Sequence, residues 1–552
     1  MTTTTVGVRD LLRRPVFVRW LGFAGSVLLG IAAFVGGAFP TLVLDASPTT
    51  IADGPHGALI YLLWTIGTVS LVGAWWLGRH LIGTGLLTGR WVTITAAMWM
   101  LPMVVCPPTG SRDVYAYACQ GALVAAGHSP YHEGVSALPC QWLDSVSIIW
   151  RDTPAPYGPL FLMIAGTAAK TGSLSLAIVL FRIVAVVGVA MIAVCLPVLA
   201  RRVGVPVDRA LWLVLACPLV IVHLVGGAHN DALTIGLLLA GLAVLANRSH
   251  RTGALILGGF LIGLSIAVKT TIGAALPFAA LFAAGGPMLP SLGVLIRKAC
   301  AVIGTALATL LALAWGSGLG LFGWVTALSH AGDSQVWTSP PTAVGLAIGY
   351  LQRPFGGTFD AVPICRLIAL IVLPIVLLVI LWHSRNHNPL YGAGLALLAT
   401  IFLAPVAQAW YLVWPLAMFA ATKARIRWLA IAITFLSCII LPDGSGLTRF
   451  LQGPMTFVMT GIVIWVVIRG FSWLRGYEPN EIDFDAIRIR PETEPEPVPA
   501  VVGAVVAENG HLPSGLADLR TTEELEPAPV ERSASERAAS ERSAAAMPPD
   551  GV

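Results

Sequence analysis

Long apolar runs alternate with short polar segments along most of the chain, and this alternation predicts membrane-spanning helices. A helix of about 20 apolar residues is long enough to cross a bilayer, and we count about 14 such spans, within a range of about 13–15. The pattern therefore predicts an all-α polytopic membrane protein. The runs lie near residues 20–39, 56–77, 91–107, 174–200, 209–226, 231–247, 252–269, 272–286, 299–323, 363–383, 388–406, 409–422, 426–442 and 455–471.

Two further apolar stretches, Pro159–Ala169 and Val344–Leu351, are too short to cross a bilayer as helices. Counting either stretch as a full crossing would invert the predicted side of every loop that follows it. We therefore interpret both as re-entrant or interfacial segments on the outer side of the membrane.

The composition excludes several other classes of protein. Hydrophobic residues make up 56% of the 552 residues and charged residues only 11%, whereas a soluble domain has about 25% charged residues. A soluble enzyme is therefore excluded. The basic residues stand singly or in pairs between apolar runs, which excludes a nucleic-acid-binding face. The cysteines show no metal-ligand spacing and no outer motif groups acids at such a spacing, so we expect no metal and no cofactor.

The charges predict the orientation of the chain. With the N-terminus in the cytoplasm, 19 of the 27 basic residues before residue 478 fall inside and 10 of the 12 acidic residues fall outside, as the positive-inside rule predicts. The first run lacks a cleavage site, so residues 1–19 are interpreted as a cytoplasmic segment. Residues 20–477 form the transmembrane domain, with its main outer loop at 108–157. Residues 478–552 hold 16 acidic and 6 basic residues and are predicted to be a disordered cytoplasmic tail.

Polar residues with catalytic potential gather on the outer side. The longest hydrophilic segment is the loop 108–157, and the other outer loops are short but contain carboxylates, His, Lys and Trp. Such a one-sided cluster indicates an active site for a lipid-borne substrate. A lipid-linked sugar flippase or exporter is the alternative, but it would need a polar path through the membrane. Only Arg182 and Arg366 lie well within a predicted span.

Several motifs on this side resemble those of one enzyme family. The most specific are Arg112–Tyr115 with Gln120–Leu123, Thr153–Pro159 and Gly227–Asp231; Ala267–Lys269 and Pro442–Gly444 match more weakly. Together they resemble the actinobacterial polyprenol-phosphomannose-dependent α-(1→6)-mannopyranosyltransferases, which have the GT-C fold. The resemblance covers about residues 55–475. A related GT-C transferase for arabinose or another pentose is a second alternative.

The resemblance implies a function. The enzyme would move mannose from a polyprenyl-phosphate donor to a lipid-linked α-mannan, the lipomannan and lipoarabinomannan core, on the outer face of the plasma membrane. The donors of this family are β-linked and the products α-linked, which implies a single inverting displacement. One carboxylate then suffices as general base. Asp113 is the expected base, because it follows the third span directly; the alternative is an interfacial Asp113 paired with Arg112, with Asp152 and Glu133 as fallback bases.

We expect cationic side chains to bind the phosphate of the donor, namely Lys269, Arg112 and Arg366. Lys269 has no acidic neighbour in sequence, and its alternative role is to extend to the membrane interface. Arg366 is favoured over Arg182 because it lies nearer the outer surface. Either arginine could instead pair with a buried carbonyl or carboxylate.

Sugar contacts are expected from His229, Asn230, Asp231, Tyr157 and Tyr115. The alternative for Asn230 and Asp231 is capping of the helix that begins near Ala232. Four tyrosines have the alternative role of aromatic residues at the membrane–water interface, namely Tyr115, Tyr117, Tyr131 and Tyr157.

Two other features of the outer loops leave alternatives open. Asp333 and Asp443 are interpreted as solvated loop residues or acceptor contacts. Cys119 and Cys140 share an outer loop, where an oxidising compartment permits a disulfide, but the nearby Cys106 leaves the pairing undetermined.

Overall fold

The structure is a computed structural model that describes residues 12, 14–39, 51–285, 291–330, 335–447 and 450–474. The predicted tail 478–552 and most of the predicted segment 1–19 lie outside these residues. Within them the chain is helical and contains no strand, apart from one isolated bridge between Ile440 and Gly446. The all-α class is therefore confirmed.

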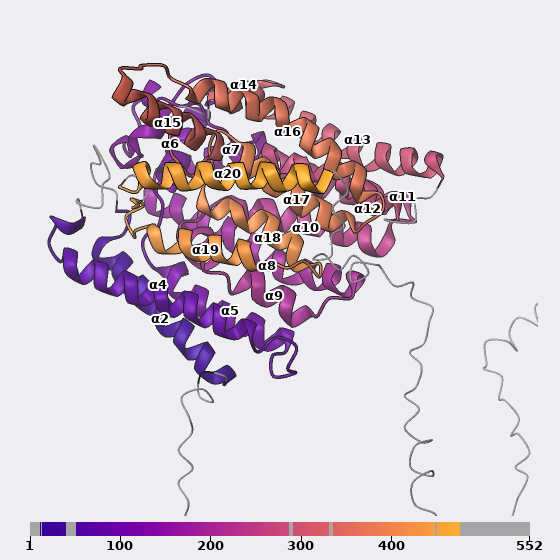
Figure 1. Ribbon diagram of the computed structural model, residues 1–552, viewed down its shortest axis with the longest axis horizontal. Coiled ribbons are helices and arrows are strands. Elements are labelled where there is room, and N and C mark those ends of the chain that lie inside the picture. The colour runs from indigo at the N-terminus through magenta and orange to yellow at the C-terminus, as the bar shows by residue number, and fades with distance from the viewer. Residues whose placement is uncertain are drawn as a thin grey trace, which may run out of the picture. The chain divides into compact units, whose positions relative to one another are not determined.

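Most of the described helices in Figure 1 are joined by short connections, but residues 126–158 form a long connection that contains three short helices. The α-helices are α2 (Pro15–Gly36), α4 (Gly57–Arg79), α5 (Gly89–Val105), α6 (Asp113–Ala125), α7 (Pro159–Ala169), α8 (Leu174–Val203), α9 (Val207–Leu215), α10 (Asp231–Arg248), α11 (Thr252–Val268), α12 (Leu276–Ala284), α13 (Leu292–Gly316), α14 (Gly323–His330), α15 (Pro340–Gln352), α16 (Val362–Ser384), α17 (Pro389–Leu403), α18 (Val413–Ala420), α19 (Arg427–Ile439) and α20 (Gln452–Leu474). The short helices are η1 (Val135–Ala137), η2 (Leu143–Ser145), η3 (Ile148–Trp150), the π-helix η4 (Val220–Gly226), η5 (Thr270–Ala275), η7 (Arg353–Phe355) and η8 (Ala409–Leu412).

Seven of the described helices are long and apolar enough to cross a membrane, and α9 with η4, bent by 59°, forms an eighth candidate. The remaining predicted spans coincide with shorter apolar helices, such as α5, α11 and α19. A polytopic membrane protein is confirmed, while the count of about 14 spans stays a prediction. The two stretches that are too short to cross form α7 and part of α15.

Small residues let neighbouring helices approach closely. At Gly188 of α8, a Cβ atom would lie 2.2 Å from the backbone of Ala232 in α10. At Gly236 of α10, a Cβ atom would lie 2.6 Å from the carbonyl oxygen of Gly188. Only glycine permits these contacts, which are typical of packing between membrane helices. They hold α10, whose N-terminus contributes to the site, against α8.

The periphery of the bundle is apolar and exposed. In α16 and α20 only 6% of the most apolar 18-residue window is buried, against 67% in α10. Their exposed side chains include Leu367, Leu378 and Trp465. An exposed apolar face of this extent fits a lipid environment. Figure 1 shows α20 as the yellow helix across the front of the bundle.

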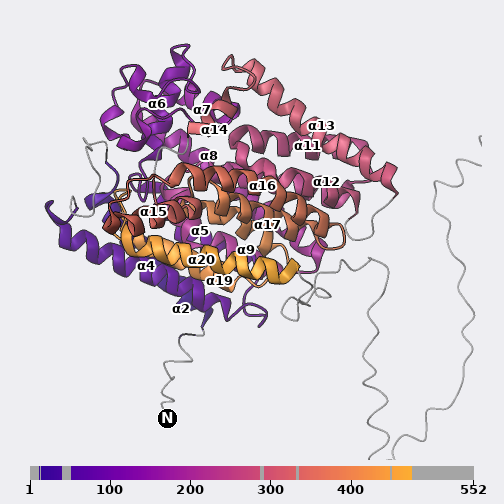
Figure 2. The same ribbon diagram turned by 45° about the horizontal axis from the view of Figure 1, so that its top comes forward.

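The main outer loop folds into a compact unit with α6 and α7, which pack against each other (Figure 2). A disulfide joins Cys119 of α6 to Cys140 in the loop, and Cys106 is a free buried cysteine. The structure thus assigns the pairing that the sequence left undetermined. The bridge ties the middle of the loop to the helix that begins with Asp113.

Candidate active site

Asp113 is the first residue of α6, and a second motif fixes the backbone in front of it. Gly110 N donates to Pro442 O at 2.9 Å, and Asp113 N donates to Ser111 Oγ at 3.1 Å. Gly444 has a φ of +86°, and a Cβ atom there would lie 3.0 Å from Ser111 Cα. The turn 442–444 therefore docks directly on the segment that presents Asp113.

Arg112 stabilises the contact between the turn 442–444 and the segment before Asp113 by donating hydrogen bonds to backbone carbonyls. Its Nε donates to Asp443 O at 3.1 Å and its Nη1 to Phe39 O at 3.1 Å. The interpretation that Asp113 pairs with Arg112 is wrong, because the guanidinium points to these carbonyls. The role of Arg112 in binding the donor phosphate stays a prediction.

The Asp113 carboxylate is partly accessible, with 16% of its side chain exposed. Burial raises the pKa of Asp113 to about 6, although the positive charge of Lys269 and the hydrogen bond with Ser111 oppose the rise. At neutral pH the carboxylate is therefore ionised, and it is a stronger base than an ordinary aspartate. Its pKa suits proton abstraction near pH 7.

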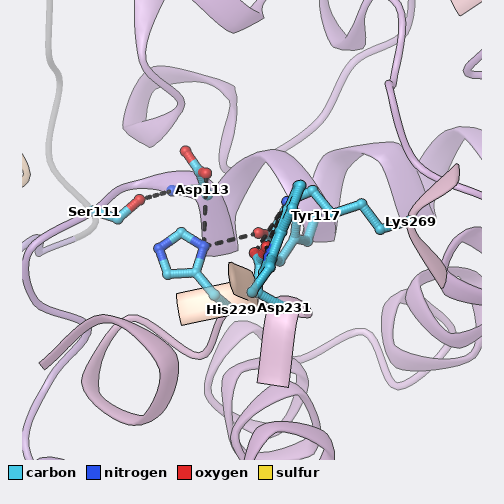
Figure 3. Close-up of polar contacts among 7 residues, drawn as sticks. Ser111, Asp113, Tyr117, His229, Asp231 and Lys269 are labelled. Atoms are coloured by element: carbon cyan, nitrogen blue, oxygen red, sulfur yellow. Dashed lines mark hydrogen bonds and ion pairs between the residues drawn. The ribbon is translucent and has the colours of Figure 1, made fainter. Parts of the chain in front are cut away.

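His229 lies beside Asp113 and is fully buried (Figure 3). Its Nδ1 is 3.8 Å from Asp113 Oδ2 and 3.2 Å from the hydroxyl of Tyr117. Its ring stacks on Trp410 with a centroid distance of 4.0 Å. Burial lowers the pKa of His229 well below its usual value, so the imidazole is neutral. His229 Nε2 has no hydrogen-bond partner among the described residues.

Lys269 forms a buried ion pair with Asp231, the first residue of α10. Lys269 Nζ lies 2.9 Å and 3.0 Å from the two carboxylate oxygens, and Trp414 Nε1 donates to Asp231 Oδ1 at 2.8 Å. The ammonium also lies 4.2 Å from the ring centroid of Tyr411. Lys269 is 6% exposed, so the interpretation that it extends to the membrane interface is wrong. The break between α11 and η5, where Lys269 has an extended backbone, directs the side chain inward.

Asn230 lies between His229 and this ion pair. It occupies the N-cap position of α10, but its side chain makes no capping hydrogen bond. Both its amide nitrogen and its amide oxygen are buried without a partner among the described residues. The capping interpretation is wrong for Asn230, and equally for Asp231, whose oxygens bind Lys269 and Trp414. An unpaired buried polar group costs about 1–3 kcal/mol, which a ligand could recover.

The predicted tyrosines separate into different environments. The hydroxyl of Tyr115 donates to Ala38 O, so it is directed away from Asp113. Tyr117 and Tyr131 are also buried, which contradicts their placement among interfacial aromatics. Tyr157 packs edge-to-face on Tyr117 with a centroid distance of 5.3 Å, and its ring lies 5.9 Å from Lys269 Nζ. Of the two tyrosines expected to contact sugar, only Tyr157 borders the cluster.

The two arginines within spans have structural partners. Arg182 donates to Cys106 O at 2.6 Å and to Gly226 O at 2.7 Å, as the carbonyl alternative predicted. It thereby joins the segments before Asp113 and His229. Arg366 Nε donates to Thr342 Oγ1 at 3.0 Å, which links α16 to α15.

The remaining predicted acids lie in other surroundings. Glu133 Oε2 is 2.9 Å from His128 Nδ1 and is 40% exposed. Asp152 is exposed and accepts a hydrogen bond from Ser136. Asp443 is buried and accepts from Ser445 N at 2.9 Å, so it is not a solvated residue. Asp333 lies outside the described residues. Within the described residues no group of three or more His, Cys, Asp or Glu could hold a metal ion.

The aromatic wall of the site was not assigned from the sequence. Trp410, Tyr411 and Trp414 come from η8 and the start of α18, and they contact His229, Lys269 and Asp231. In the sequence these three residues form an aromatic cluster at the start of an apolar run. The spacing of the cluster alone does not reveal which buried charged residues the aromatic rings contact.

The buried acid–base groups at the ends of membrane helices indicate that the protein is an integral-membrane enzyme. Comparison with known proteins identifies the family of this enzyme. Residues 19–285 match the family described as "Alpha-(1->6)-mannopyranosyltransferase, N-terminal domain", and residues 341–469 match "MptB C-terminal domain". A probable alpha-(1->6)-mannopyranosyltransferase of Mycolicibacterium smegmatis is 34% identical over 87% of this chain and 92% of its own length. Alpha-(1->6)-mannopyranosyltransferase A of Mycobacterium tuberculosis is 33% identical over 77% of this chain and 84% of its own.

The chain therefore belongs to the alpha-(1->6)-mannopyranosyltransferase family and is a glycosyltransferase. No solved structure matches it. The resemblance inferred from the motifs is confirmed. A glycosyltransferase requires a sugar donor and an acceptor, and the membrane helices require a lipid bilayer.

Proposed function

We propose that this enzyme transfers mannose from a polyprenyl-phosphomannose donor to a hydroxyl of a lipid-linked α-mannan, forming an α-(1→6) bond on the outer face of the plasma membrane. The names of the relatives support mannose and the linkage. The observation that carries the proposal is the Asp113 carboxylate, which is partly accessible, ionised at neutral pH and under the electrostatic influence of the buried Lys269 ammonium.

In the proposed reaction Asp113 is the general base. One of its carboxylate oxygens accepts the proton of the acceptor hydroxyl. At the same time the oxygen of that hydroxyl attacks C1 of the mannose. The bond between C1 and the phosphate oxygen breaks, and polyprenyl phosphate leaves with the electron pair. A β-linked donor then gives an α-linked product by inversion. Asp113 needs no second carboxylate, because phosphate is already a good leaving group.

Lys269 is the proposed contact to the departing phosphate. Two of its hydrogen bonds go to Asp231, and an ammonium has a third N–H, which is proposed to donate to a phosphate oxygen. Asp231 fixes the ammonium in place, so its orientation does not change during the reaction. Arg112 and Arg366 are weaker candidates, since the former holds the backbone before Asp113 and the latter links α15 to α16.

The sugar ring is proposed to contact Asn230, His229 and Tyr157. The free amide of Asn230 can donate to one hydroxyl and accept from another, and His229 Nε2 offers a further partner. The ring of Tyr157 supplies an apolar surface beside Lys269. Asp231 holds Lys269 and contributes to sugar binding only indirectly.

A transfer assay tests this proposal. Purified protein would be given polyprenyl-phosphomannose labelled in the sugar, together with a short α-(1→6) mannoside. We expect a labelled product extended by one α-(1→6)-linked mannose. A parallel reaction with polyprenyl-phosphoarabinose tests the pentose alternative, and translocation of labelled donor across vesicles tests the flippase alternative. Transfer of arabinose but not mannose, or translocation without transfer, would overturn the proposal.

A further inference from the structure

A second cluster of charged residues lies far from Asp113. Four arginines line a pocket of about 370 Å3 between the C-terminal end of α4, the start of α9 and the connection from α18 to α19. They are Arg79, Arg209, Arg425 and Arg427. These elements contact one another in the structure, so the pocket is formed by the bundle itself.

The pocket and the active site lie at opposite ends of shared helices. Helix α4 ends at Arg79, whereas Trp64 in its first half bonds to Ile440 O, close to the turn at Asp443. Helix α9 begins near Arg209 and continues through η4 towards His229. The 23 residues of α4 extend about 34 Å at 1.5 Å per residue. The positive-inside rule predicts that this arginine end faces the cytoplasm.

The positive charge of these arginines is not neutralised by any carboxylate in the described part of the chain. Within the described residues none of the four forms an ion pair. Arg209 donates to the carbonyl oxygens of Ala420, Thr422 and Ala424, and so it closes the end of α18. Arg79 Nη1 is buried and has no hydrogen-bond partner in the part of the chain that the structure describes. The nearby Asp208 carboxylate accepts instead from Gly83 N.

The surroundings suit a lipid headgroup. Arg79 stacks on Trp76 with its Cζ 4.4 Å from the ring centroid, and Trp428, next to Arg427, is 74% exposed. Tryptophan and arginine together are typical of the membrane–water interface. Basic pockets between membrane helices on the cytoplasmic side bind anionic lipid headgroups. We propose that this pocket binds the phosphate of an anionic phospholipid in the leaflet opposite the active site.

Lipid retention by the full-length protein tests the proposal. Protein in nanodiscs of phosphatidylcholine would be mixed with phosphatidylglycerol, and retained lipid measured by native mass spectrometry. We expect phosphatidylglycerol to be retained in preference to phosphatidylcholine. Arg79→Gln, and separately the exposed pair Arg425→Gln/Arg427→Gln, should weaken retention about five-fold for each arginine removed. Arg209 is left unchanged because it closes α18, and Arg248→Gln, at the exposed end of α10, is the matched control.

Any one of four results would overturn this inference. Equal retention of the two lipids, or unchanged retention in both variants, would remove the lipid site. Full displacement by millimolar inorganic phosphate would assign the pocket to free phosphate. Unchanged lipid retention, together with faster trypsin cleavage of residues 478–552 in the paired variant, would assign it to that acidic segment.

Discussion

Lys269 Nζ lies within 3.0 Å of both carboxylate oxygens of Asp231, in a buried site that Asp113 and His229 share (Figure 3). The pair joins the end of α11 to the start of α10, and its charges balance each other. Because Asp231 immobilises the ammonium, we propose that the cation is preorganised for a leaving phosphate. On that proposal the same two side chains serve both stability and catalysis, so the two effects need separate measurements.

Replacing Lys269 alone leaves a buried, unpaired Asp231. Lys269→Met should therefore lower stability by about 3–5 kcal/mol, as removal of one partner of a buried pair does. In Lys269→Met/Asp231→Asn neither member of the pair is charged, and the introduced side-chain amide can still accept from Trp414. We expect the melting temperature to recover in the double variant while the donor KM stays raised. A donor KM that returns to the wild-type value would assign Lys269 a structural role only.

The activity should depend on the ionisation of Asp113. A protonated carboxyl cannot accept a proton, and burial raises the pKa of Asp113 to about 6. Activity is thus present above pH 6, and kcat/KM should fall about tenfold for each pH unit below it. Burial lowers the pKa of His229 well below its usual value, which opposes protonation of its ring in this range. A kcat/KM profile that is flat from pH 7 to pH 4.5 would contradict this assignment.

Replacement of Asn230 by an apolar residue should preserve or raise the stability of the protein while it impairs the transfer reaction. Its side chain is buried without a partner among the described residues, so Asn230→Leu removes a desolvated polar group and should leave the melting temperature unchanged or raise it. The same change should raise the sugar-donor KM or lower kcat by about tenfold, if two hydroxyl contacts are lost.

The matched control is Asn388, which is equally buried but caps α17 by accepting from Leu390 N. Asn388→Leu should cost about 1 kcal/mol of stability and leave the donor KM unchanged. Loss of stability in Asn230→Leu with unchanged kinetics would assign Asn230 to packing.

The sequence predicted the helices well, because apolar runs of span length have one structural solution in a bilayer. The sequence also indicates that Asp113, His229 and Asp231 lie in one cluster, since they stand where polar residues follow apolar runs, and the structure brings them together around Lys269; their roles stay predictions. The sequence does not predict the pair between Lys269 and Asp231, because a sequence separation of 38 hides the fact that the start of α10 meets the end of α11. No sequence pattern reveals that Arg112 donates to the carbonyls of Phe39 and Asp443, and its role as a phosphate ligand stays a prediction.

The predicted orientation can be tested by labelling. His132 in the loop 108–157 and His250 after α10 are both exposed, and they are predicted to lie on opposite sides of the membrane. A membrane-impermeant thiol reagent should label His132→Cys but not His250→Cys in intact cells, and both after permeabilisation. Labelling of the wild-type protein measures the background from the exposed native cysteines Cys300 and Cys438. The reverse pattern would place the active site in the cytoplasm.

The central claim is that Asp113 is the general base, and kcat of Asp113→Asn tests it most directly. Asparagine keeps the shape of the side chain but cannot accept the proton, so kcat should fall about 10²–10⁴-fold while the donor still binds. Asp152→Asn and Glu133→Gln serve as controls and should stay near the wild-type rate, because both acids are exposed and bond to other partners. Near-normal turnover in Asp113→Asn, or the large loss in either control instead, would contradict the account.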